Sequence, residues 1–149
     1  MSRLVRTPVP GLPEARRRML MVVSGGVWLS GLIWLLFHYG LRQKTDFGYT
    51  SHPMEHWSLA VHGMFAFAAL WMFGLLWGVH IQMGWRRNRR RRSGGTLFGI
   101  VLWLAVSGLG LYYLENPDLL TWLAVAHWVA GISAAGAFAL HWLARTQAA

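Results

Sequence analysis

The sequence contains no cysteine and few acidic residues, with five Asp or Glu in 149 residues. Without cysteine the chain cannot form disulfides, and it has no thiolate ligands for zinc or for an iron–sulfur cluster. It also lacks a Cys-x-x-Cys-His motif, so covalent attachment of a c-type haem is excluded. The sequence is instead 55% hydrophobic, with ten Trp and a net charge of +9. This composition is not that of a soluble globular domain.

Four long apolar stretches occupy most of the chain, and each approaches or exceeds the roughly 20 residues that cross the hydrocarbon core of a bilayer. The first is longer than the usual core of a signal peptide and lacks a small-residue cleavage pattern, so we treat it as a helix. We therefore predict an all-α fold, an integral membrane four-helix bundle over residues 19–145 behind a tail of residues 1–18. The expected transmembrane helices are 19–41, 56–85, 95–114 and 118–144.

The charges alternate between the two ends of these predicted helices. Twelve of the fourteen basic residues lie in the N-terminal segment, in the linker between the second and third helices, or at Arg145. Four of the five acidic residues lie in the other two loops. This distribution follows the positive-inside rule and predicts that both termini are cytoplasmic. It explains the arginine run as a topology signal, so we expect membrane lipid and no nucleic acid as a partner.

Four histidines lie inside the second and fourth predicted helices, where ionisable residues are costly and usually functional. From His62 to His80 is eighteen positions, or five whole helical turns, which returns to the same face. From His127 to His141 is fourteen positions, which returns to within about 40° of the same face. Each helix thus presents one histidine near each membrane surface on a single stripe.

The second and fourth helices run in the same direction, so His62 can face His127 and His80 can face His141. Two such pairs are what two bis-histidine haems require, with imidazoles approaching each iron from opposite sides. The two spacings differ, at about 27 Å and 21 Å along the helix axes. His38 or His56 could therefore replace a member of the outer pair, or either could lie at the interface and bind a propionate or a quinone.

The two histidine stripes share small residues and a phenylalanine at equal offsets. Small residues beside a ligand leave space for a macrocycle, and the phenylalanines could pack between two cofactors. Ordinary helix packing also favours Ala and Gly, so both interpretations stay open for these small residues. The matching positions are Ala66, Ala69 and Phe73 after His62, and Gly131, Ala134 and Phe138 after His127.

The segments "VHGMFAFAALWMFGLLWGVHIQMGWR" and "HWVAGISAAGAFALHW", supported by "SGLGLYY" at the end of the third helix, resemble the bacterial di-haem membrane cytochromes b, in particular their minimal four-helix members. The resemblance covers about residues 19–144. It implies two non-covalent b-type haems, with His62 and His127 on the outer iron and His80 and His141 on the inner one. It also implies a bacterial inner-membrane location and electron transfer between the quinone pool and a redox partner protein. Arg86 and Arg87 would then balance the inner-haem propionates.

Two other functions compete with electron transfer. The first is a membrane anchor or scaffold subunit without cofactor, whose histidines make hydrogen bonds between helices. The second is a protein that binds Zn or Cu through its histidines. The sequence indicates no bond-making chemistry, because no embedded carboxylate accompanies the histidines. It leaves open the oligomeric state and whether the chain is the cytochrome subunit of a quinol-linked oxidoreductase.

Overall fold

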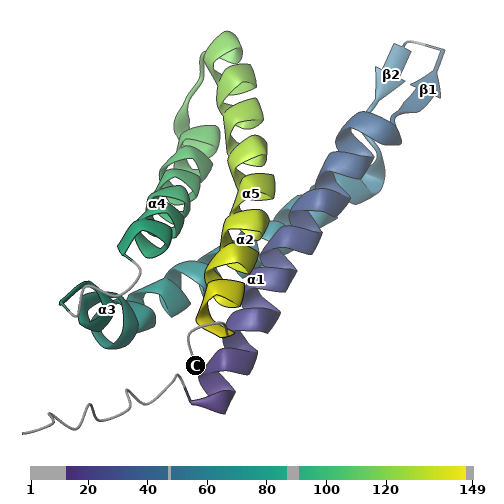
Figure 1. Ribbon diagram of the computed structural model, residues 1–149. Coiled ribbons are helices and arrows are strands. Elements are labelled where there is room, and N and C mark those ends of the chain that lie inside the picture. Colours follow the sequence, from purple (N-terminus) through teal and green to yellow (C-terminus); the bar gives the residue numbers. More distant parts are fainter. Residues whose placement is uncertain (1–12, 47, 87–90, 147–149) are drawn as a thin grey trace, which may run out of the picture.

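The computed structural model describes residues 13–46, 48–86 and 91–146, and the side chains of residues 79, 80 and 144–146 are not described. Helices dominate this part of the chain (Figure 1). In chain order the elements are α1 Glu14–Leu35, the π-helix η1 Leu36–Gly40, the strands β1 Gln43–Thr45 and β2 Gly48–Thr50, α2 Pro53–Leu76, the π-helix η2 Trp77–Ile81, α3 Gln82–Arg86, α4 Arg91–Tyr113 and α5 Pro117–Thr146.

Four of these helices are long and apolar enough to cross a membrane, which confirms the prediction of four apolar helices in a bundle. The qualifying segments are Glu14–Gly40, Pro53–Leu76, Arg91–Tyr113 and Pro117–Leu143. Their outward surfaces carry many exposed large apolar side chains, as lipid-facing helices do. By their length and composition, these helices suggest a multi-pass membrane protein.

The helices begin earlier than the hydropathy of the sequence indicates. The first starts at Glu14, five residues before the expected start, and Glu14 forms an ion pair with Arg18 one turn later. The second starts at Pro53, where proline suits the first helical position and His52 Nδ1 accepts a hydrogen bond from the Met54 amide. Apolar periodicity marks only the part of a helix that lies in lipid, so it misses polar turns that extend beyond the hydrocarbon core.

Three features of the backbone depart from four uninterrupted helices. α1 ends in η1, and the second membrane-crossing helix changes from α2 to η2 at Trp77 before α3 completes it. The loop after η1 contains a two-stranded antiparallel hairpin that pairs Gln43 with Thr50. Gly48 begins the second strand with φ of 118°, a conformation that favours glycine.

The bundle consists of two helical hairpins, α1 with α2 and α4 with α5, which lie across each other in Figure 1. Glycine permits the close packing within each hairpin. A Cβ atom at Gly26 of α1 would overlap the Phe65 ring of α2, and one at Gly110 of α4 would lie 2.7 Å from a Leu123 methyl group of α5. Contacts between the hairpins are fewer and involve mainly α1 with α5.

Little of the described chain is buried. The buried hydrophobic side chains are Val23 and Met72, and the buried polar ones are Ser30, Ser58 and Ser107. In the described part of α5, no residue is buried. The side chains of α5 are therefore not fully covered by those of the other helices, and this part of the bundle interior is not tightly packed.

Candidate functional site

The two histidine stripes face the interior of the bundle. Every described member is half-buried, whereas neighbours such as Met64 and Phe67 are 72% and 77% exposed. The half-buried members are His62, Ala66, Ala69 and Phe73 on α2, and His127, Gly131, Ala134, Phe138 and His141 on α5.

His62 and His127 meet across the interface between the two hairpins. Their ring centroids lie 6.4 Å apart, and the ring planes are nearly perpendicular, at 85°. For two imidazoles on opposite sides of one metal ion, metal–nitrogen bonds of about 2.0–2.1 Å and a ring radius of about 1.15 Å give a centroid separation of roughly 6.4 Å. The spacing of this pair therefore fits a shared metal ion, and perpendicular planes are compatible with such a pair because each ring can rotate about its bond to the metal.

His62 is held by the turn of α1 that contains Ser30. Its Nδ1 lies 3.0 Å from the Val27 carbonyl oxygen and 3.2 Å from Ser30 Oγ. A carbonyl oxygen can only accept a hydrogen bond, so Nδ1 carries the proton and donates it. Ser30 in turn donates its hydroxyl proton to the Gly26 carbonyl, at 2.6 Å.

His127 is held in the same way by α4. Its Nδ1 lies 2.8 Å from Ser107 Oγ, and Ser107 Oγ lies 2.7 Å from the Trp103 carbonyl oxygen. When the Ser107 hydroxyl donates to the Trp103 carbonyl, its oxygen can accept a hydrogen bond from Nδ1–H of His127. Ser107 is 1% exposed, and the bonds satisfy its buried hydroxyl.

The contact with the Val27 carbonyl assigns the Nδ1–H tautomer to His62, and the contact with Ser107 is compatible with the same tautomer in His127. With the proton on Nδ1, Nε2 keeps its lone pair and is directed away from the serine. Within the described residues, neither Nε2 has a hydrogen-bond partner. Metal-bound histidines commonly donate their other ring nitrogen to a hydroxyl or carbonyl, which fixes the ring orientation. Both imidazoles are therefore arranged as metal ligands are.

A Ser-Gly dipeptide recurs opposite each described histidine of the stripes. In each case the serine bonds Nδ1 and the glycine lies next to Cε1 of the ring, most closely at Gly31, where a Cβ atom would lie 3.2 Å from His62 Cε1. Ser30-Gly31 contacts His62, Ser107-Gly108 contacts His127, and Ser93-Gly94 contacts His141, whose Nδ1 is 3.1 Å from Ser93 Oγ.

The sequence contains a signal for these partners that hydropathy alone does not reveal. Ser93 and Ser107 are fourteen positions apart, the same spacing as His127 and His141. In an antiparallel hairpin, equal spacings bring both serines opposite both histidines. Neither Ser30 nor Ser107 is predicted from the sequence as part of the site.

The inner histidine pair is only partly defined. His141 lies on α5 against α4, whereas the side chain of His80 lies outside the described part of the structure. His80 itself falls within η2, so the expected count of five whole α-turns from His62 does not apply to this helix. Arg86 is exposed at the end of α3 and borders a small pocket with Gln82, while Arg87 lies outside the described residues.

The three remaining histidines lie where η1 and α2 adjoin the β1–β2 loop, and each has its own partner. His38 Nδ1 lies 2.6 Å from a Glu55 carboxylate oxygen, and its ring stacks on Trp34. His52 stacks on Phe37, and His56 is exposed with its ring edge toward Trp57. Neither His38 nor His56, the alternative outer ligands, makes a ring contact with His62 or His127 among the contacts of the described residues.

The phenylalanines of the stripes have different partners. Phe73 packs on Phe98 of α4, with ring centroids 5.4 Å apart, and so connects the two hairpins. Phe138 packs on Trp142 of its own helix, at 6.2 Å. The two rings therefore occupy the stretch of the bundle between the outer and inner histidine positions.

The pair of imidazoles suits a haem better than a bare metal ion. Structural zinc sites use four protein ligands and catalytic zinc sites use three. The described residues contain no group of three or more His, Cys, Asp or Glu side chains that could hold a metal ion. Two axial imidazoles suffice for a haem because its macrocycle supplies the remaining ligands.

Comparisons with protein-family models, with curated proteins and with solved structures found no match for this chain.

Proposed function

We propose that this protein is a b-type haem protein of a bacterial inner membrane that carries electrons within or across the bilayer. His62 and His127 would hold the outer haem, and His80 and His141 the inner one. Bound haem supplies one-electron redox chemistry, while the protein fixes its position and tunes it through ligand orientation.

One observation carries the proposal. Two imidazoles from different hairpins lie 6.4 Å apart, and each donates Nδ1–H to the adjacent helix. Each imidazole keeps one ring nitrogen that makes no hydrogen bond within the described residues, and the separation of the two rings would leave room for a haem iron between them.

One observation favours the alternative function of a membrane anchor without cofactor. All three described stripe histidines make hydrogen bonds to the neighbouring helix of their hairpin, as that function requires. Those bonds connect α1 with α2 and α4 with α5, which already pack closely. The His62–His127 contact connects the two hairpins and contains no direct hydrogen bond. The anchor therefore accounts for the serines but not for the pair.

The proposal is tested by histidine substitution in the purified protein. We expect His62→Ala and His127→Ala each to abolish the same haem signal in reduced-minus-oxidised spectra, because each removes one axial ligand. His56→Ala is the matched control, since His56 is exposed and lies on the same helix as His62. Full haem content in both His62→Ala and His127→Ala would refute the ligand assignment. Loss of haem in His56→Ala would show that the outer site includes His56.

A further inference from the structure

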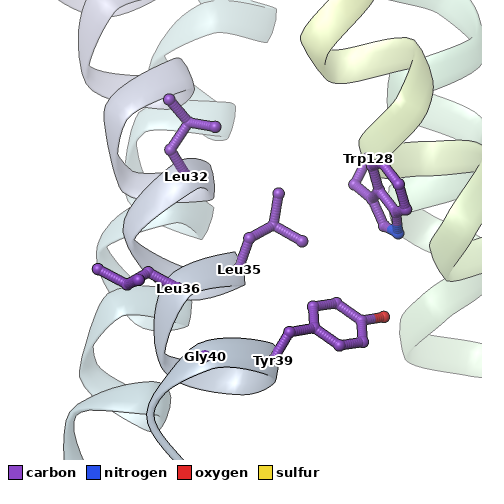
Figure 2. Close-up of a pocket in the computed structure, with 6 residues that line it drawn as sticks. All are labelled: Leu32, Leu35, Leu36, Tyr39, Gly40 and Trp128. Carbon is purple, nitrogen blue, oxygen red and sulfur yellow. The ribbon is translucent and has the colours of Figure 1, made fainter.

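A groove along η2 and α3 combines polar and apolar side chains on the surface of the bundle. Its volume is about 270 Å³, and it is lined by Gly78, Gln82, Met83 and Arg86. The open gap between the end of α1 and α5, shown in Figure 2, is lined mainly by leucine and aromatic side chains. The groove at Arg86 therefore has the groups to select a charged ligand, and the gap in Figure 2 does not.

Arg86 has no acidic partner among the described residues. Its side chain is exposed and forms neither of the two ion pairs found there. Of the five acidic residues, Glu14 is the one that lies at this end of the bundle, and it pairs with Arg18. Arg91 adds a second guanidinium group beside Arg86, because it donates to the Trp85 carbonyl and lies 5.3 Å from the centre of the Trp85 ring. The positive charge at the groove thus needs an anion from outside the protein.

The groove lies where the second membrane-crossing helix leaves the apolar region. η2 and α3 follow the apolar span that ends at Leu76, and Trp85 beside the groove is 55% exposed, as tryptophans at a membrane–water interface are. A Cβ atom at Gly78 would meet nothing within 4 Å, and the same holds at Gly74 one turn earlier. Open helix surface therefore extends from Arg86 toward the part of the helix that faces hydrocarbon.

We propose that this groove binds one molecule of an anionic phospholipid. Arg86 donates paired hydrogen bonds to the phosphate oxygens, a geometry for which the planar guanidinium group is suited. The Gln82 amide, one turn away, donates to the same headgroup. An acyl chain lies along the open surface at Gly78 and Gly74. Basic pockets at the cytoplasmic side of membrane proteins bind anionic headgroups in this way.

The lipid site goes beyond the proposed electron transfer and does not depend on bound haem. It gives Arg86 a different ligand from the haem propionate that the resemblance implies. Both ligands are anionic, so the charge of Arg86 alone does not separate them. The exposure of Arg86 and its position beside an open groove favour the lipid.

The test is native mass spectrometry of the purified full chain, titrated with phosphatidylglycerol or with phosphatidylcholine of the same acyl chains. We expect one saturable site for phosphatidylglycerol and none for phosphatidylcholine, which has no net negative charge. Arg86→Gln should weaken phosphatidylglycerol binding about tenfold or more, because it removes charge-assisted hydrogen bonds. Arg17→Gln is the matched control, since Arg17 is exposed near the start of α1 at the same end of the bundle (Figure 1). It removes the same charge and should bind as the unsubstituted protein does.

A second variant fills the groove and leaves the charge unchanged. Gly78→Leu should abolish saturable phosphatidylglycerol binding, because the new side chain occupies the path of the acyl chain. The helix has room for it, since a Cβ atom at Gly78 meets no other atom. Gly99→Leu is the control, at an exposed glycine of α4 where a Cβ atom also meets nothing within 4 Å. It should keep the site.

Four results would overturn the lipid site. Equal binding of the two lipids would remove the selectivity for an anion, and equal weakening by Arg86→Gln and Arg17→Gln would assign the effect to diffuse surface charge. Displacement of phosphatidylglycerol by an equal concentration of inorganic phosphate would show a site for free phosphate. Loss of haem together with lipid binding in Arg86→Gln would assign the guanidinium group to a propionate.

Discussion

A serine hydroxyl of the adjacent helix lies beside Nδ1 of each imidazole of the outer pair. Ser30 and Ser107 use their own proton on a backbone carbonyl of their helix, so each can accept from Nδ1 of the facing histidine. The result is a lone pair on Nε2 in both rings. In the proposed haem site this arrangement would orient the imidazoles before the cofactor binds, which would reduce the conformational entropy lost on binding.

Removing one hydroxyl tests this function of serine. We expect Ser107→Ala to lower haem affinity about 10- to 100-fold without removing a ligand, because His127 loses the bond that fixes its orientation. The measurement is haem titration into apo-protein, with the low-spin spectrum as a second readout. Ser133→Ala is the control, because Ser133 is exposed on the same helix and donates only to the Val129 carbonyl. Equal affinities in the two variants would contradict the proposed function of Ser107.

At this scale the sequence reveals the histidines but not their partners. A histidine in an apolar stretch is conspicuous because it is costly there. A serine next to a glycine is also expected of simple helix packing, so Ser30-Gly31 gives no distinct signal by itself. Only the pairing of helices shows which serine faces which histidine.

The packing of α1 against α2 depends on one close contact, between Gly26 and Phe65. Gly26 lies directly under the Phe65 ring, whereas a Cβ at the preceding Gly25 would meet nothing within 4 Å. The two glycines are adjacent in the same helix, so they share helix propensity and membrane depth. Only one of them is required by packing.

We expect Gly26→Ala to destabilise the protein by about 1–3 kcal/mol, because the new methyl group overlaps an aromatic ring of the facing helix. Gly25→Ala should leave stability unchanged or raise it by up to about 1 kcal/mol through helix propensity. Thermal unfolding in detergent micelles, followed by circular dichroism, measures both. If Gly25→Ala lowered the stability more than Gly26→Ala does, the hairpin would have to pack in a different register.

The helices themselves follow from the sequence, but their irregularities do not. Runs of apolar residues determine that four helices form, because in lipid each backbone polar group needs a partner within its own helix. The π-turns at η1 and η2 depend on packing against neighbouring helices, and they change the face on which later residues lie. For this reason the sequence spacing predicts which face of α2 carries His62 through Phe73, but it does not predict the face on which His80 lies.

For the whole molecule, the charge distribution predicts an orientation. The arginines before α1 and between α3 and α4 should lie in the cytoplasm, with the β1–β2 hairpin on the other side. We expect a green fluorescent protein fused after Ala149 to be fluorescent, and alkaline phosphatase fused at Asn116 to be active, since each reporter works on only one side of the membrane. The reverse result for both fusions would show that the topology is the inverse of the predicted one.

The arrangement of the bundle as two hairpins explains where the candidate site lies. Close packing by glycines holds each hairpin together, and the sparser interface between hairpins contains the His62–His127 pair and the Phe73–Phe98 contact. Parallel stripes on the second and fourth helices were predictable from spacing. The approach of the outer pair to 6.4 Å depends on how the two hairpins cross, which local sequence does not encode.

The most direct test of the haem proposal is the haem content of the purified, unsubstituted protein, measured from reduced-minus-oxidised absorbance against protein concentration. We expect low-spin b-type haem at about two per chain, released by acid extraction because it is not covalently bound. Protein that is folded and helical but shows no haem band, even after expression with added haem, would contradict the haem proposal.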